Sequence, residues 1–194
     1  MTTENLYPVF LKLRDRDVLV VGGGPVAASK LAALIAAGAR VRVVAPAVSP
    51  EIEALGVPIT RRAFEPQDLD GAWFVVAAAP PEVNREVARA AEARQIFVNA
   101  VDDVASASAY LGGVVRKGGV TLAISTDGQA PALAGLLREG LEQVLPDDLD
   151  RWTKTAVTVR RRWLRDRVPM AARRGLLLQA LNRLYARHGQ EVML

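Results

Sequence analysis

The side chains that could carry out acid–base or redox chemistry in this chain are few. Its 194 residues contain no cysteine and one histidine, His188, which excludes thiolate zinc sites, iron–sulfur clusters and multi-histidine metal sites. We therefore expect no metal-binding residues and assign proton transfer to carboxylates, hydroxyls, lysine or arginine. Asp102 and Asp103 follow directly after an apolar run at 96–101. An acid at the carboxyl end of a buried strand lies where open α/β sheets bind ligands, so Asp102 is the main candidate.

Two interpretations of Asp102 remain equal on the residues alone. In the first, its carboxylate lies in an apolar cleft and accepts a proton, or guides a metal ion into a substrate. In the second, it is a solvated loop carboxylate, which is the interpretation that we adopt for the neighbouring Asp103.

A glycine-rich segment indicates a nucleotide site. The pattern Gly22-x-Gly24-x-x-Ala27 follows an apolar run at 18–21 and precedes an Ala- and Leu-rich stretch at 27–37. In this context the first glycine permits a tight turn, the second lets the backbone approach a pyrophosphate, and Ala27 allows close packing of helix and strand. The helix N-terminus then supplies N–H groups to the anion. The alternative, a glycine turn without a ligand, is the weaker interpretation.

The end of the second expected strand lacks the usual acidic residue that binds the adenosine ribose. It reads Val44-Ala45-Pro46-Ala47, so ribose contacts would come from backbone groups and would discriminate poorly between NAD and NADP. Arg40 and Arg42 lie upstream and could favour a 2′-phosphate, although the preferred interpretation places them in solvent.

Strand and helix signals alternate over the first two thirds of the chain, which indicates a parallel sheet with crossover helices. The expected strands are 18–21, 41–45, 59–64, 73–79 and 96–101, with helices at 27–37, 50–55 and 81–94. A hairpin (110–115 and 120–126) and helices at 131–145, 148–165 and 170–187 follow. We therefore predict an α/β protein with a Rossmann-type parallel sheet (1–112), a small β–α segment (113–147) and a C-terminal helical domain (148–194).

Charge is distributed unevenly along the chain. Residues 1–150 contain 14 Lys/Arg and 19 Asp/Glu, a net −5, whereas 151–194 contain 11 Lys/Arg and 2 acids, a net +9. The basic part indicates an anionic partner, namely nucleic acid, a membrane surface or a polyanionic small molecule, or else a solvated helical face. No apolar run approaches the ~20 residues of a membrane helix and the N-terminus does not read as a signal peptide. We therefore expect a cytoplasmic protein without a membrane partner.

Several motifs occur together in an order and spacing that resemble a known family. They are YPVFLKL at 7–13, VLVVGGGPVA at 18–27, VVAP at 43–46, VAAA at 76–79, VNAVD at 98–102 and AISTDGQAPALA at 123–134. Together they resemble the precorrin-2 dehydrogenase/sirohydrochlorin ferrochelatase family, which includes the N-terminal module of bifunctional siroheme synthases.

The resemblance implies NAD-dependent oxidation of precorrin-2 to sirohydrochlorin, Fe(II) insertion as a further activity, and a homodimer formed through segment 113–147. It assigns the central acidic role to Asp102. Matching cofactor positions are Gly22, Gly23, Gly24, Pro25, Val26, Pro46, Ala47, Ala78 and Ala79, and matching substrate positions are Asn99, Ser125 and Thr126. An equal alternative for Ser125 and Thr126 is to cap the helix that begins near Pro131. The basic helices, Arg161 and Arg162 among them, would pair with the carboxylates of a tetrapyrrole.

Two departures from the family pattern lie near the expected cleft. Residues 109–113 stand where the family often has Phe and Pro, and Pro80 and Pro81 stand where it commonly has acidic residues. The family's substrate contacts and its chelatase activity therefore do not transfer directly to this sequence. The alternative function is an NAD-responsive regulator with a nucleic-acid-binding C-terminal domain, but helices separated at Pro169 do not match a helix-turn-helix. The Tyr-x-x-x-Lys pair of short-chain dehydrogenases does not occur in the sequence.

Overall fold

The computed structural model describes residues 6–186, so His188 lies outside the described part of the chain. The chain divides into two compact units. The first unit contains the residues up to Leu111 together with the turn Asp127–Gln129, and the second contains Gly112–Thr126 and the residues from Ala130 onward.

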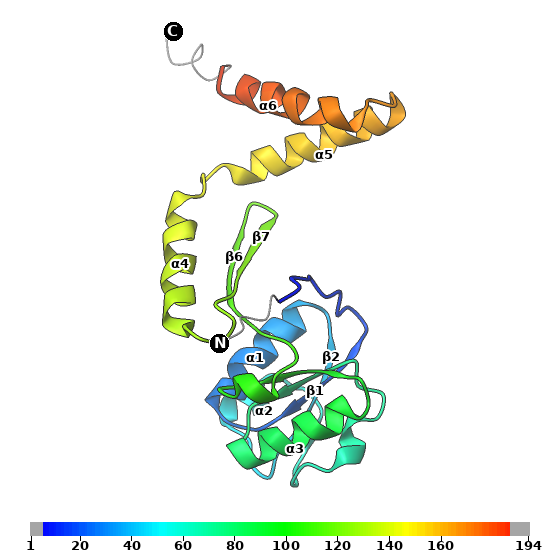
Figure 1. The fold of residues 1–194 in the computed structure, drawn as a ribbon, viewed down its shortest axis with the longest axis vertical. Coiled ribbons are helices and arrows are strands. Elements are labelled where there is room, and N and C mark those ends of the chain that lie inside the picture. The colour runs from blue at the N-terminus through cyan, green and yellow to red at the C-terminus, as the bar shows by residue number, and fades with distance from the viewer. Residues whose placement is uncertain (1–5, 187–194) are drawn as a thin grey trace. The chain divides into compact units, whose positions relative to one another are not determined.

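The first unit is built around a parallel sheet with the strand order β3-β2-β1-β4-β5 (Figure 1). The strands are β1 (Asp17–Val21), β2 (Arg40–Val44), β3 (Ile59–Thr60), β4 (Phe74–Ala77) and β5 (Phe97–Ala100). Continuous apolar runs form the central strands because both of their faces are covered. All strands run in one direction, so their carboxyl ends, where the candidate residues occur, meet at one edge of the sheet.

Helices cover both faces of this sheet. On one face, α1 (Pro25–Ala36) and α2 (Pro50–Ala54) pack Leu31 and Ile52 against Val18 and Val20. On the other face, α3 (Pro81–Glu92) and the short 3₁₀ helix η1 (Pro66–Leu69) pack against Leu19 and Val75. Short helix η2 (Val104–Ser106) follows β5. Each face of the sheet therefore has its own apolar core, formed by residues of the first unit.

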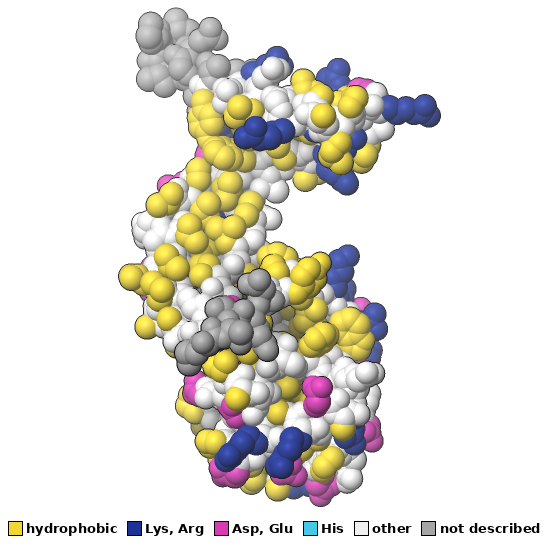
Figure 2. All heavy atoms as spheres, viewed as in Figure 1, with side chains coloured by type: hydrophobic (Ala, Val, Ile, Leu, Met, Phe, Trp, Pro, Cys, Tyr) yellow, Lys and Arg dark blue, Asp and Glu magenta, His cyan; other side chains and the backbone are white. Residues whose placement is uncertain are grey.

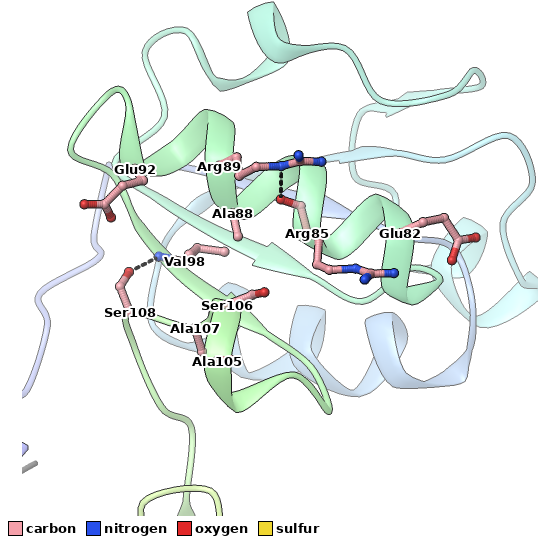
Figure 3. Close-up of a pocket in the computed structure, with 10 residues that line it drawn as sticks. All are labelled: Glu82, Arg85, Ala88, Arg89, Glu92, Val98, Ala105, Ser106, Ala107 and Ser108. Carbon is pink, nitrogen blue, oxygen red and sulfur yellow. Dashed lines mark hydrogen bonds between the residues drawn. The ribbon is translucent and has the colours of Figure 1, made fainter. Parts of the chain in front are cut away.

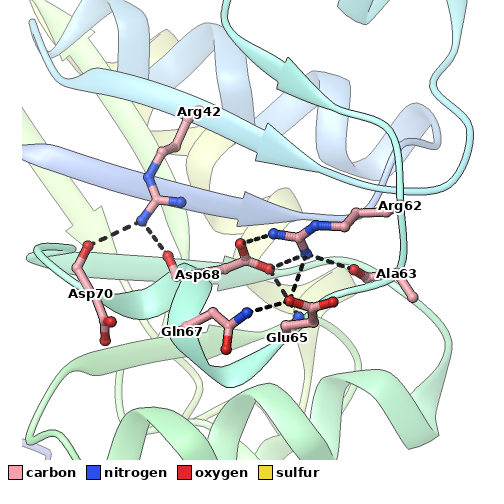
Figure 4. A network of polar contacts seen from close by, with 7 residues as sticks. All are labelled: Arg42, Arg62, Ala63, Glu65, Gln67, Asp68 and Asp70. Carbon is pink, nitrogen blue, oxygen red and sulfur yellow. Dashed lines mark hydrogen bonds and ion pairs between the residues drawn. The ribbon is translucent and has the colours of Figure 1, made fainter.

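The expected third strand, 59–64, is too long. Only Ile59–Thr60 pairs with β2, because the chain then turns at Arg62 toward η1. There the Arg62 guanidinium donates to both carboxylate oxygens of Asp68, at 2.6 and 2.7 Å, and the side chain of Arg42 donates to the carbonyl oxygens of Asp68 and Asp70 (Figure 4). This polar network competes with strand pairing and ends β3 early.

The second unit consists of a hairpin and three helices. Strands β6 (Gly113–Lys117) and β7 (Val120–Ile124) pair antiparallel, and α4 (Pro131–Val144) packs against β6. Helices α5 (Leu149–Arg165) and α6 (Met170–Ala186) follow and contact each other. The predicted fold class is confirmed: a Rossmann-type parallel sheet followed by a β–α segment and C-terminal helices. The first strand of the hairpin begins at Gly113, three residues later than expected.

Within residues 6–186, no helix combines the length and the apolar character that crossing a membrane would require.

Candidate functional site

The three glycines after β1 have different structural tasks. A Cβ at Gly22 would lie 2.1 Å from the carbonyl oxygen of Ala78, and a Cβ at Gly23 would lie 1.9 Å from that of Ala47. Both positions therefore require glycine for the fold itself, and Gly22 also has a φ of +127°. A Cβ at Gly24 would meet nothing within 4 Å. The protein leaves the space beside Gly24 open, and an approaching ligand can use it.

The N-terminus of α1 faces this open space. Gly24 is the N-cap and provides no side-chain cap, Pro25 occupies the first turn, and that turn contains no acidic residue. The first N–H groups of a helix lack partners within the helix, and their partial positive charge favours an anion. Val26 is exposed in the same turn. An uncapped helix end beside an unfilled glycine position fits the pyrophosphate of a dinucleotide.

The segment after β2 is held against the glycine loop. The Ser49 N–H donates to the carbonyl oxygen of Gly23 at 2.8 Å, and Pro46 and Ala47 are exposed beside it. The upstream arginines are used elsewhere. Arg40 forms a bidentate pair with Asp17 at 2.7 and 2.9 Å and stays exposed, as the preferred interpretation expects. Arg42 differs from that interpretation, because it is partly buried and donates to backbone carbonyl oxygens near η1.

Residues after β4 and β5 complete the same edge. The Ala78 N–H donates to the carbonyl oxygen of Val21, and the Val101 N–H donates to that of Ala77, at 2.8 and 2.9 Å. Ala78 and Ala79 are partly exposed there. The structure thus brings the nine proposed cofactor residues and Asp102 to the carboxyl edge of one sheet, within the first unit.

Asp102 has a left-handed backbone with a φ of +58°, and its side chain is exposed. Of the two interpretations, the described residues do not form the apolar cleft around Asp102 that the first one requires. Asp103, in contrast, is not a solvated carboxylate. It accepts hydrogen bonds from the Ser106 N–H at 3.1 Å and from the Ser106 hydroxyl at 2.7 Å, and so caps η2. The interpretation of Asp103 as a solvated loop carboxylate is wrong.

Asn99 is 7% exposed, and its amide donates to the carbonyl oxygen of Ala109 at 2.9 Å. Nearby, the Ser108 hydroxyl accepts from the Val98 N–H at 2.9 Å, and the Ser108 and Ala109 N–H groups donate to the Val98 carbonyl oxygen. These bonds fold the loop that begins at Asp102 back onto β5. Asn99 therefore anchors this loop, whereas its proposed substrate contact stays a prediction.

The remaining proposed substrate residues belong to the second unit. The Thr126 hydroxyl accepts from the N–H of Ala130 at 3.2 Å, which orders the turn before α4. Helix α4 has Ala130 as its N-cap and no side-chain cap, so Thr126 does not cap this helix. Arg161 and Arg162 are exposed on α5, and Arg162 lies 3.5 Å from the Asp166 carboxylate. Their roles toward a substrate stay predictions.

One residue of this edge was missed by the sequence analysis. Asn84 on α3 is 3% exposed, and it connects the loop after β4 with the loop after β5. A signal was present, since Asn84 occupies the spacing of the buried stripe that continues through Val87, Ala88 and Ala91. A polar residue in such a stripe requires hydrogen-bond partners in the interior.

A cavity of about 670 Å³ lies between α3 and the segment that includes η2 (Figure 3). Arg85 and Arg89 line one wall, residues 105–108 the other, and Val98 the floor. None of the proposed site residues lines this cavity. Among residues 6–186, no group of three or more His, Cys, Asp or Glu side chains could hold a metal ion.

The sheet, the glycine loop and the open helix end define the class of a Rossmann-type dinucleotide-binding protein. A family model described as putative NAD(P)-binding matches residues 9–113, and a model of the sirohaem biosynthesis protein central domain matches 117–143. Among solved structures, SirC, a precorrin-2 dehydrogenase, is similar with a TM-score of 0.70 and 31% identity, covering 90% of this chain and 88% of that chain. The chain therefore belongs to the putative NAD(P)-binding family and is related to the precorrin-2 dehydrogenase SirC. This confirms the family resemblance and supports NAD as the cofactor.

Curated relatives agree with this assignment. A siroheme synthase of Citrobacter koseri is 40% identical over 86% of this chain, and one of Xylella fastidiosa is 42% identical over 87%. The matched parts are 38% and 37% of those proteins, so the chain spans less than two fifths of their length.

Proposed function

We propose that this protein oxidises precorrin-2 to sirohydrochlorin in the cytoplasm, with NAD as the hydride acceptor. The observation that carries the proposal is the open glycine position at the uncapped start of α1, on the same sheet edge as Asp102. Likeness to SirC over 88% of its chain supports the choice of reaction. NAD supplies the chemistry of hydride acceptance when bound.

Asp102 is the proposed proton acceptor. Removal of a hydride from the macrocycle leaves a proton to be lost, and a nearby carboxylate can take it. The side chain makes no hydrogen bond or ion pair with the described residues, so both oxygens are available to a substrate. The balanced reaction converts precorrin-2 and NAD⁺ into sirohydrochlorin, NADH and a proton. Insertion of Fe(II) stays a prediction of the resemblance.

The substrate carries many carboxylates, and the basic helix α5 has the charge to bind them. Arg161 has no ion-pair partner among residues 6–186. Arg162 has one, the exposed Asp166, which also pairs with Arg165. Guanidinium groups pair with carboxylates in bidentate geometry. These two arginines are the proposed substrate contacts on α5.

We further propose a homodimer formed through the second unit. Large apolar side chains lie exposed at spacings of three and four residues along α4, and Figure 2 draws them as a yellow surface over this helix. They are Leu133, Leu136, Leu137, Leu141 and Val144. A continuous apolar face of this kind is unfavourable in water and is typical of an obligate subunit contact.

The alternative, a regulator that binds nucleic acid through α5 and α6, gains no support. The two family models concern NAD(P) binding and sirohaem biosynthesis, and the relatives from Citrobacter koseri and Xylella fastidiosa are siroheme synthases. The long helices α5 and α6 are joined around Pro169 without the glycine-containing turn of a helix-turn-helix.

The direct test is anaerobic incubation of the purified protein with precorrin-2 and NAD. We expect the absorbance of sirohydrochlorin and of NADH to rise together in equal amounts. NADH formation without sirohydrochlorin, or no reaction with precorrin-2 at all, would refute the proposed activity. Duplex DNA retained at physiological salt would favour the regulator instead.

A further inference from the structure

Asn84 uses both ends of its amide group at the proposed site. Its Oδ1 accepts a hydrogen bond from the Ala79 N–H at 2.9 Å, and its Nδ2 donates to the Val101 carbonyl oxygen at 3.3 Å. Ala79 belongs to the proposed cofactor loop, and Val101 is the residue before Asp102. One buried side chain therefore contacts the two loops that the proposed reaction needs.

The backbone around Asp102 is held from both sides. Before it, the Val101 N–H donates to the Ala77 carbonyl oxygen, and the Val101 carbonyl accepts from Asn84. After it, the Asp103 carboxylate caps η2 through its two bonds to Ser106. Asp102 itself has the left-handed backbone that non-glycine residues adopt only at a cost, so surrounding contacts must maintain it. No side-chain partner among the described residues aims its carboxylate.

We propose that Asn84 is a positioning residue that couples the cofactor loop at Ala78–Ala79 to the loop carrying Asp102. The inference rests on the proposed function and extends it to a residue outside the glycine motif and the Asn99–Asp102 motif. Through its Oδ1 it keeps the Ala79 backbone in place for the dinucleotide. Through its Nδ2 it sets the direction in which Asp102 leaves β5.

The two sides of this coupling predict separable effects. Loss of Asn84 releases both loops, whereas loss of Asp103 releases only the loop of Asp102. Displacement of a reacting group by about 1 Å can lower a rate by roughly 100-fold. A residue that acts only through Asp102 has no further effect on turnover once Asp102 is gone.

The test compares Asn84→Ala, Asp103→Ala and Asp102→Ala, with each of the first two also combined with Asp102→Ala. NAD affinity is measured by calorimetry and turnover by sirohydrochlorin formation. We expect Asn84→Ala to weaken NAD binding several-fold and to lower kcat about 10- to 100-fold. Asp103→Ala should lower kcat similarly, with NAD affinity within about 2-fold of the parent. Neither change should lower kcat further in the Asp102→Ala background.

Asp70→Ala is the matched control, since Asp70 is exposed and pairs with Arg94 away from the carboxyl edge. If Asn84→Ala does not fold, Asn84→Asp at pH 8 replaces it. The ionised carboxylate still accepts from the Ala79 N–H but cannot donate to Val101, so NAD binding should persist while turnover falls.

Additive losses of kcat in the double variants, or unchanged NAD affinity in Asn84→Ala, would overturn the inference. If the parent protein does not oxidise precorrin-2, the proposed function fails. The coupling of the two loops by Asn84 is then tested without turnover, by hydrogen exchange and NAD binding. Amide hydrogen exchange of Ala79, which donates to Asn84, and of Val101, which donates to the Ala77 carbonyl oxygen, should then accelerate in Asn84→Ala, together with weaker NAD binding. Unchanged exchange at either position would refute the coupling itself.

Discussion

The two units of this chain bury their apolar side chains to very different extents. In the first unit, both faces of the sheet are covered, and strands and helices share two continuous cores. In the part of the second unit that the structure describes, the buried apolar residues are Val115, Ala134 and Leu149, whereas Leu136 and Val144 are 66% and 79% exposed. The first unit completes its core alone, and the second needs further apolar surface to cover its own.

This difference suggests a division of tasks. A self-sufficient sheet can hold a cofactor loop and the proposed proton acceptor in fixed positions, because a close-packed interior deforms little. A hairpin and helices with an uncovered apolar face are suited to assembly. Substitutions in the first unit should therefore alter ligand binding, chemistry or stability, and substitutions in the second should alter assembly or substrate attraction.

The largest effect is expected at Gly24 in the first unit. Gly24→Val adds a side chain to the space that the protein leaves open, where the pyrophosphate should lie. NAD affinity, measured by calorimetry, should fall by at least about 100-fold, equivalent to roughly 2.7 kcal/mol. The thermal midpoint should stay near that of the parent. Gly22→Val is the contrasting variant and should not fold, because its Cβ would overlap the Ala78 carbonyl.

The next effect concerns assembly through the second unit. Leu136→Asp combined with Val144→Asp places two charges on the exposed face of α4, and together these changes should weaken a subunit contact by roughly 3 kcal/mol. The dimer should dissociate at concentrations about 100-fold higher than for the parent, as measured by light scattering. Leu55→Asp, at a partly exposed apolar position of the first unit, should leave the mass unchanged. If the parent protein is a monomer, the second unit does not form the subunit contact that its exposed apolar face predicts.

Stability of the first unit should depend on the Asp68 network. Asp68 is 7% exposed, and its hydrogen bonds with Arg62 hold the pKa of its carboxyl below the ordinary value. Asp68→Asn should lower the free energy of unfolding by about 1–2 kcal/mol at pH 7, since Arg62 is partly solvated. Because the folded pKa is lowered, this stabilisation is present above the unfolded pKa of about 3.9 and is lost as the pH falls below it.

Denaturation with urea at several pH values checks this result. The difference between parent and Asp68→Asn should be constant from pH 6 to 8 and should shrink in acid. Asp150→Asn in the second unit, where the ion pair with Lys154 is exposed, should cause no measurable change. A pH-independent difference would assign the effect to packing rather than to charge.

The smallest effect is expected for the basic face of α5. Arg161→Glu combined with Arg162→Glu should raise the KM for precorrin-2 about 10-fold and leave NAD affinity unchanged. Added salt should reduce the difference between variant and parent, because exposed charges are screened. Steady-state kinetics at two ionic strengths provide the measurement. Equal KM values would mean that these arginines are a solvated face.

The sequence predicted most elements of the first unit because local signals there agree with the final packing. Apolar runs at 18–21 and 41–45, each bounded by glycine or proline, became central strands. The third strand was overestimated, since residues 61–64 have suitable side chains for a strand. Asp68, six residues further along the chain, draws Arg62 out of strand pairing, and the residue types at 61–64 do not reveal this competition.

For the candidate site, the sequence by itself determined the glycine loop, the position of Asp102 at a strand end and the family. These features depend on residue type and short spacing, which the chain order preserves. Only the tertiary structure separated Gly24, which faces open space, from Gly22 and Gly23, which touch the neighbouring backbone. It also gave Asp103 a capping role and revealed Asn84 as a bridge between two loops. Such roles depend on which backbone groups lie within hydrogen-bond distance, and parallel strand order brings those groups together from remote parts of the chain.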